Sequence, residues 1–351
     1  MSDVTQGADH DVVVVGGGAA GLNAALVLAR ARRRVAVVDA GEPRNAPAAH
    51  TQGFLSRDGM PPHALLEVGR TEAAGYGAAL INARVDHVEP GFTVHLVGGA
   101  ALGARRLVVA TGLRDELPDI PGVAGRWGKD VLHCPYCHGH EVRDEPLGVL
   151  GTSPAAVHQA LLLRQWTDDV VLFAHTLELS GEDHERLIAR GVRLVDGEIK
   201  RMVVENERLS GVELAGGRTV PRRAVFLSPR MVPNDALLTE LGCATQDGRV
   251  MTDRTGRTTV PGVWAIGNVA DPRAQVVTAA GAGSAAAIAV NTDLLDEDVT
   301  HAVAHYRATD QSGAAKQPRT PEQPNVVGGP GAVGHPRVDE EARGETRGGG
   351  R

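Results

Sequence analysis

Two of the three cysteines of this chain stand close enough together to work as a pair. Cys134 and Cys137 lie in the stretch HCPYCHGHEV, which also holds His133, His138 and His140. A C-x-x-C pair can be half of a zinc site, a structural disulfide or a redox-active dithiol. The chain has no second C-x-x-C, so a zinc site would have to draw its remaining ligands from these histidines.

A redox dithiol is the interpretation that these residues favour. A disulfide that closes so short a loop restricts the unfolded chain little, which argues against a purely structural bond. We expect Cys137 to begin a helix, whose N-terminal field, with His138 directly after it, would lower the pKa of the thiol. We therefore expect no metal ligands, and zinc stays open as a second interpretation.

A glycine-rich turn near the N-terminus predicts a dinucleotide site. In DVVVVGGGAAGLNAALVLARARRRVAVVDAG, residues 11–41, the run 11–15 predicts a buried strand, followed by a helix to about Arg30 and a second strand over 35–38. The turn fits G-x-G-x-x-G, and the acid that ends the second strand stands where one binds a ribose. The expected nucleotide contacts are Gly16, Gly18, Ala19, Ala20, Gly21 and Asp39.

Two later strands resemble the further fingerprints of two-dinucleotide flavoproteins. They are RRLVVATG, residues 105–112, and VPGVWAIGNVAD, residues 260–271. The stretch 145–175 repeats the order strand, glycine turn, helix, strand. The resemblance implies an α/β fold of two Rossmann-like dinucleotide-binding domains, the second inserted into the first, with FAD in the first. The expected divisions are a tail 1–9, an FAD domain 10–116 and 247–300, an inserted NAD(P)-type domain 117–246, and a disordered tail 301–351.

The combination of these motifs resembles the low-molecular-weight thioredoxin reductases. In that family the second cysteine faces the flavin and the first exchanges with the substrate, which implies these roles for Cys137 and Cys134. The family has an acid directly after the second cysteine, where this chain has His138, and an imidazole can exchange a proton near neutral pH. The remaining FAD contacts implied by the resemblance are Arg44, Asn45, Ala110, Thr111, Gly112, Gly267, Asn268, Gln275, Val276 and Val277.

The second glycine turn departs from the thioredoxin reductase pattern. It reads GTSPAA, with Ser153 where a close-approach glycine belongs and with Pro154, which has no N–H. Glu178 follows the next strand, in place of the arginines that would bind a 2′-phosphate. NADPH binding is therefore doubtful. With CPYCH and the stretch 41–59, these departures resemble the dithiol oxidase subgroup of gliotoxin and holomycin type.

Composition and charge limit the other partners. The 351 residues carry a net charge of −7, with scattered lysines and arginines, so nucleic acid is not expected. The chain shows no apolar run of membrane-spanning length and no signal peptide, and we expect a cytoplasmic protein. The resemblance to the thioredoxin reductases also implies a homodimer. The expected partner is a small-molecule dithiol or a thioredoxin-like protein. Two alternatives stay open: a disulfide reductase using NADPH or another donor such as ferredoxin, and a flavin- or zinc-binding regulator without turnover.

Overall fold

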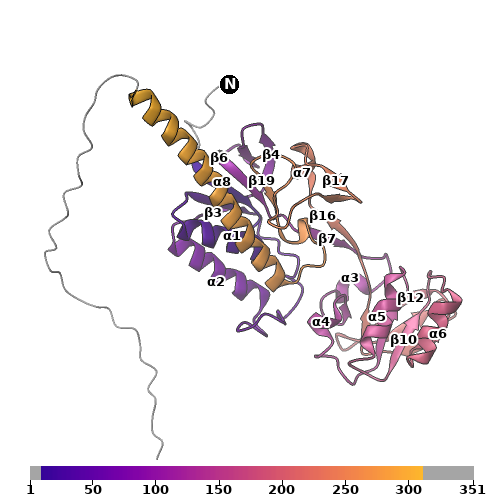
Figure 1. The fold of residues 1–351 in the computed structure, drawn as a ribbon. Helices are drawn as coiled ribbons and strands as arrows, with labels where there is room; N and C mark the ends of the chain where they lie inside the picture. The colour runs from indigo at the N-terminus through magenta and orange to yellow at the C-terminus, as the bar shows by residue number, and fades with distance from the viewer. Residues whose placement is uncertain (1–8, 311–351) are drawn as a thin grey trace, which may run out of the picture. The chain divides into compact units, whose positions relative to one another are not determined.

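The computed structural model describes residues 9–310 and contains a mixed sheet with a Rossmann-type order (Figure 1). The strands run β3-β2-β1-β6-β5-β4, with β19 parallel to β6. The strands β1, β2, β3 and β6 pair in parallel, whereas β4, β5 and β6 form an antiparallel meander. The strands are β1 (His10–Val15), β2 (Val35–Asp39), β3 (Ala79–Asn82), β4 (Val85–Glu89), β5 (Thr93–Leu96), β6 (Ala101–Val109) and β19 (Val263–Ala265).

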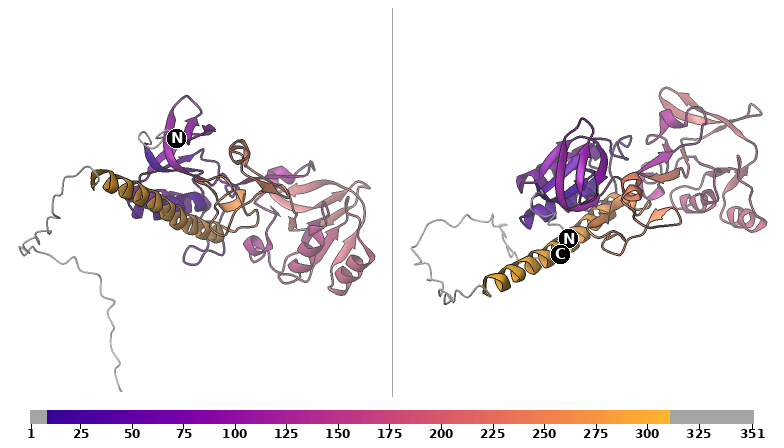
Figure 2. Two further views of the ribbon diagram at one scale, coloured as in Figure 1. Left: turned by 45° about the horizontal axis from the view of Figure 1, so that its top comes forward. Right: turned by 90° about the horizontal axis from the view of Figure 1, so that it is seen from above.

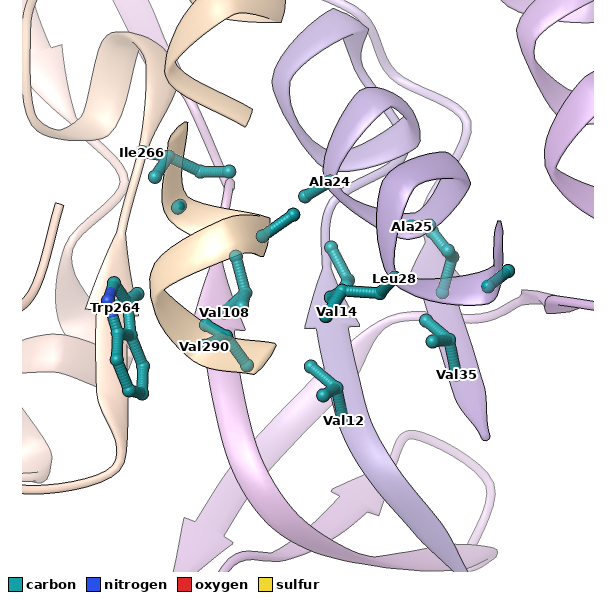
Figure 3. Packing of buried hydrophobic residues seen from close by; sticks show 14 of the residues in the cluster. Val12, Val14, Ala24, Ala25, Leu28, Val35, Val108, Trp264, Ile266 and Val290 are labelled. Atoms are coloured by element: carbon teal, nitrogen blue, oxygen red, sulfur yellow. The ribbon is translucent and has the colours of Figure 1, made fainter. Parts of the chain in front are cut away.

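Strand β1 is buried on both faces, as its unbroken valine run predicts. Successive side chains of a strand point to opposite faces, so Val12 and Val14 enter one core and Val13 and Val15 another. In the first core, Val14 and Val108 pack against Leu28 of one helix and Val290 of another, as Figure 3 shows. The helices of this part of the chain are α1 (Ala19–Arg30), α2 (Pro62–Gly75), α7 (Ala236–Glu240), the 3₁₀ turn η1 (Gly267–Val269) and α8 (Val276–Asp310).

A second sheet is wholly parallel and has the order β11-β10-β9-β15-β8. Its strands are separate from those of the first sheet, and Figure 2 shows the two groups in magenta-pink and in indigo-purple. The strands are β8 (Val131–Leu132), β9 (Leu147–Leu150), β10 (Val170–Phe173), β11 (Arg193–Val195) and β15 (Ala224–Phe226). The helices are α3 (Val123–Arg126), α4 (Pro135–His138), α5 (Ala155–Leu163) and α6 (Gly181–Ala189). The sheets and their order confirm the predicted α/β fold with two Rossmann-type units.

Three small antiparallel sheets complete the fold. They consist of β12 (Ile199–Glu205), β13 (Arg208–Leu214) and β14 (Thr219–Pro221); of β7 (Leu113–Glu116) and β16 (Arg230–Pro233); and of β17 (Thr245–Gln246) and β18 (Arg249–Val250). Strands β7 and β16 pair antiparallel, so the segment that leaves the first sheet lies beside the segment that returns to it. Within residues 9–310, no helix combines the length and the apolar character that crossing a bilayer requires.

Two predicted boundaries need correction. Leu237, Leu238 and Cys243 belong to a core cluster of the first sheet, so the chain has returned to that sheet before the predicted residue 247. The short helix α7 has too few residues to show a period in the sequence. Helix α8 also continues to Asp310, through the first ten residues of the predicted tail 301–351. The segment 301–310 holds no proline or glycine to stop the helix. Residues 311–351 lie outside the described part of the chain.

Candidate active site

The first glycine turn leaves an open space at the N-terminus of α1. A Cβ on Gly16, which has φ +108°, would lie 2.3 Å from the carbonyl oxygen of Ala110, and one on Gly21 would lie 1.9 Å from that of Gly16. These glycines therefore allow strand and helix to pack. Gly18 is different: a Cβ there would meet nothing within 4 Å, and the residue caps α1 without a side chain. Backbone N–H groups at such a helix start suit a pyrophosphate.

A cavity of about 960 Å³ extends from this turn to the cysteine pair. Cys134, Cys137 and His138 all line it. Of the residues predicted to bind the cofactor, those that line it are Gly16, Gly18, Ala19, Ala20, Asp39, Arg44, Asn45, Ala110, Thr111, Gly112, Gly267, Asn268, Gln275 and Val276. Gly21 does not, because its role is packing. Val277 does not either: it lies one helical step beyond Val276 and is 40% exposed.

Arg44 joins three segments that are distant in the sequence. Its Nε and Nη2 donate to the two carboxylate oxygens of Asp115 at 2.8 and 2.7 Å, and its Nη1 donates to Asn268 Oδ1 at 3.3 Å. The Nδ2 of Asn268 in turn donates to the carbonyl oxygens of Asp271 and Ala274. The arginine thus holds the strand end of β7 and the glycine–asparagine turn at the same side of the cavity. Sequence analysis missed Asp115, because only its spatial neighbours reveal its part in this cluster.

Asp39 keeps a carboxylate oxygen beside the cavity. Its Oδ2 accepts a hydrogen bond from Arg70 of α2 at 2.9 Å, and both side chains are about three-quarters buried. The ion pair holds the carboxylate in one orientation, and a carboxylate has acceptor sites to spare for a ribose hydroxyl. Together with the open space at Gly18, this arrangement fits the adenosine half of a dinucleotide.

Cys134 and Cys137 form a disulfide, with their Cα atoms 5.3 Å apart. Helix α4 begins at Pro135, so Cys134 is its N-cap and Cys137 lies inside it. This corrects the expectation that Cys137 begins a helix. The φ angle of proline suits the first position of a helix, so the helix begins at Pro135, two residues before Cys137. Both cysteines are half-buried, whereas Tyr136 between them is exposed and meets Trp166 edge-on.

The three histidines of this stretch have different surroundings. His133 and His138 line the cavity, and His140 is exposed and does not. Burial lowers the pKa of His138, and the nearby charge of Glu141 partly opposes that shift. Burial also lowers the pKa of His133, whose Nδ1 donates to the carbonyl oxygen of Leu227 at 3.1 Å. His138 is therefore neutral near pH 7 and can accept a proton.

Gln159 of α5 holds the cysteine loop, and sequence analysis missed it. The side chain is only 5% exposed, and its Nε2 donates to the carbonyl oxygen of His133 at 2.6 Å. Its Oε1 is buried without a hydrogen-bond partner, and the residue lines the cavity. The sequence signal for this role is the presence of Gln159, a polar residue, in a helix made mostly of apolar residues.

Replacing Gln159 with methionine should loosen the cysteine loop. The change keeps the volume but removes the donor to His133, and an unpaired buried carbonyl costs about 1–3 kcal/mol. We expect the thermal unfolding midpoint to fall and the rate at which the cysteine pair exchanges with an added thiol to fall as well. Gln165→Met, at an exposed position, is the matched control. An unchanged midpoint and rate for Gln159→Met would show that the loop does not depend on this bond.

The second glycine turn differs from the first at the position of Gly18, where it has Ser153. A Cβ on Gly151 would lie 2.5 Å from the carbonyl oxygen of Ala174, so this glycine serves packing. Pro154 is the N-cap of α5, and the amides of Ala156 and Val157 already donate to the carbonyl oxygens of Ser153 and Pro154. This helix start therefore offers fewer free N–H groups to a pyrophosphate than the start of α1 does.

These features define a flavoprotein disulfide oxidoreductase: two Rossmann-type units, one open dinucleotide turn, and a cysteine pair on the same cavity. The sequence profile of the pyridine nucleotide-disulphide oxidoreductases matches residues 10–284, and the chain belongs to that family. It is therefore an oxidoreductase with an FAD-type flavin site, which the cavity fits. The match does not favour the alternative of a flavin- or zinc-binding regulator without turnover.

Individual relatives agree with this assignment. The thioredoxin reductase sirT of Leptosphaeria maculans is 31% identical over 315 residues, which cover 82% of this chain and 95% of the relative. The crystal structure of HlmI is 64% identical and covers 90% of this chain and all of that one, with a TM-score of 0.84. An oxidoreductase from Agrobacterium tumefaciens is 37% identical and covers 82% of this chain and 98% of that one, with a TM-score of 0.78.

Proposed function

We propose that this enzyme oxidises a dithiol to a disulfide with O₂ as acceptor and H₂O₂ as product. The observation that carries the proposal is the contrast between the two glycine turns, which both line the cavity: the first has open space at Gly18, whereas the second has Ser153 and a proline cap, followed by amides that are already bonded. The resemblance to the dithiol oxidases and the 64% identity with HlmI support it.

The chain's own groups account for the exchange steps. A substrate thiolate attacks the sulfur of Cys134, which forms a mixed disulfide and releases Cys137 as a thiolate. The second substrate thiolate then attacks the substrate sulfur of that bond, which closes the product disulfide and releases Cys134. His138 accepts the proton that a substrate thiol must lose. An FAD held beside the Gly18 turn and Asp39 would supply the two-electron redox chemistry that links the reduced cysteine pair to O₂.

Oxygen uptake tests this function. The holoenzyme is given small-molecule dithiols or reduced thioredoxin in air, and O₂ consumption, H₂O₂ and product disulfide are measured together. The proposal requires one O₂ consumed and one H₂O₂ formed for each disulfide. Rapid NADPH-dependent disulfide reduction with no oxygen uptake would instead establish the alternative, a thioredoxin-disulfide reductase, which the comparisons do not favour.

We expect NADPH to reduce the flavin slowly or not at all. Ser153 and Pro154 replace the phosphate-binding part of the second turn, and Glu178 and the first-turn acids Glu182 and Asp183 of α6 follow β10, where their charges would repel a 2′-phosphate. The measurement is the visible flavin absorbance during anaerobic titration with NADPH. Fast, stoichiometric bleaching at micromolar NADPH would contradict this expectation.

We further propose that the enzyme is a homodimer working in the cytoplasm. Ile288, Leu295 and Val299 of α8 are each more than half exposed and, at 3.6 residues per turn, lie along one side of the helix. A second copy of the chain would cover such an apolar strip. Light scattering on the holoenzyme checks the oligomeric state, and a monomeric mass would refute the dimer.

A further inference from the structure

The hairpin of β4 and β5 brings two histidines and a glutamate together outside the cavity. His87 and His95 are direct cross-strand partners, and their rings stack with centroids 4.4 Å apart and planes 6° from parallel. Glu89 is two residues after His87, so it points to the same face of β4. None of the three lines the cavity that holds the cysteines. They belong to the outer edge of the first sheet, because β4 is its last strand.

The ligand-type atoms of these three side chains lie within 4.8 Å of one another. Within residues 9–310, no other group of three histidine, cysteine or acidic side chains meets that condition. His95 Nε2 lies 3.3 Å from Glu89 Oε1, yet it is buried and makes no hydrogen bond. A buried ring nitrogen without a hydrogen bond costs free energy, and a metal ion would satisfy its lone pair.

Asp86 supplies the support that metal-binding histidines usually have. Its Oδ2 lies 3.0 Å from His87 Nδ1. A carboxylate at that distance favours the tautomer with the proton on Nδ1 and leaves the lone pair on Nε2. Metal-ligating histidines generally donate their second ring N–H to such a group, which fixes the ring and strengthens it as a donor.

We propose that His87, Glu89 and His95 form a binding site for a divalent transition metal of the zinc type. Two imidazole nitrogens and one carboxylate suit Zn²⁺, Co²⁺ or Ni²⁺, whereas Mg²⁺ and Ca²⁺ prefer oxygen ligands throughout. Because the two rings are stacked in the structure, one ring has to turn about its Cβ–Cγ bond before both nitrogen lone pairs point at one ion. The remaining coordination position is open to water. This site departs from the expectation, drawn from the sequence, that the chain has no metal ligands.

A metal ion bound by these three residues would link the edge strand β4 to its neighbour β5, because the ligands come from both strands. A ligand that binds the folded state alone raises stability in proportion to the logarithm of its concentration over its dissociation constant. Zinc should therefore raise the thermal unfolding midpoint without changing the rate of dithiol oxidation, because the cavity is lined by other residues.

The test is a titration of metal-free holoenzyme with Zn²⁺ against a chromophoric chelator. The Cys134–Cys137 disulfide is kept closed, so that the cysteines do not compete for zinc. We expect one equivalent to bind to the wild type and to the control His184→Ala, which removes an exposed histidine of α6. His87→Ala and His95→Ala should each lose at least about 100-fold in affinity, and Asp86→Asn about 10- to 100-fold.

Thermal unfolding gives a second readout. Zinc should raise the midpoint of the wild type and of His184→Ala, and should leave that of His95→Ala unchanged. If His95→Ala fails to retain FAD, Glu89→Gln takes its place, because it keeps the shape of the ligand and removes its charge. A wild type that binds no zinc, or histidine variants that bind it as tightly as the wild type, would overturn the proposal.

Discussion

Serine at either position 134 or 137 will stop the proposed dithiol oxidation, but only the Cys137→Ser enzyme will be recovered as a mixed disulfide after treatment with a disulfide probe. Both cysteines line the cavity and are joined as a disulfide, so loss of either removes the electron acceptor of the first exchange step. In Cys137→Ser, the thiolate of Cys134 can attack an added asymmetric disulfide of a monothiol, which expels one thiolate and leaves a mixed disulfide that no neighbouring thiolate resolves. Mass spectrometry of the intact, non-reduced protein measures the added mass.

The matched control for this experiment is Cys243→Ser. Cys243 is 6% exposed, belongs to the core of the first sheet and does not line the cavity. It should form no adduct, and its replacement should leave turnover intact. Trapping on Cys134→Ser instead of Cys137→Ser would show that the substrate attacks Cys137, and the proposed roles of the two sulfurs would have to be exchanged.

The His138→Ala enzyme will oxidise dithiols about 10²- to 10⁴-fold more slowly at neutral pH, with an unchanged FAD content. That range is typical for the loss of a positioned general acid or base. His138 lines the cavity next to Cys137, and burial lowers its pKa, so the neutral imidazole can accept a thiol proton. The deficit should shrink as the pH rises, because the thiols then ionise without help. The measurement is the rate of oxygen uptake from pH 5 to pH 9.

The direction of the pKa shift gives this prediction a second test. A base with a lowered pKa keeps its neutral form until the pH falls below that pKa, so the wild-type rate should decline only below about pH 6.5. Glu141 raises the pKa of His138, so Glu141→Gln should move this decline to lower pH. His140→Ala is the control, because His140 is exposed and does not line the cavity. A normal rate of oxygen uptake in His138→Ala, together with a strongly reduced rate in His133→Ala, would assign the base to His133.

The parts of the site that are built from neighbouring residues could be predicted from the sequence alone. The valine run of β1, the glycine turn and the start of α1 are consecutive, and the preferences of strand, turn and helix act over such short distances. The same holds for the proline that caps α5 and for the pairing of Cys134 with Cys137. The family resemblance then supplied a role for each motif.

The contacts between residues that are distant in the sequence became visible in the folded chain. Nothing in the local sequence at Asp115 or Gln159 shows that one anchors Arg44 and the other holds the cysteine loop, because both contacts join segments brought together by different strands and helices. The early return of the chain at Leu237 and the opposition of His87 to His95 likewise depend on packing and strand register. The free energy gained by burying a hydrophobic cluster comes from many residues in different segments, so it cannot be predicted from any single segment of the sequence.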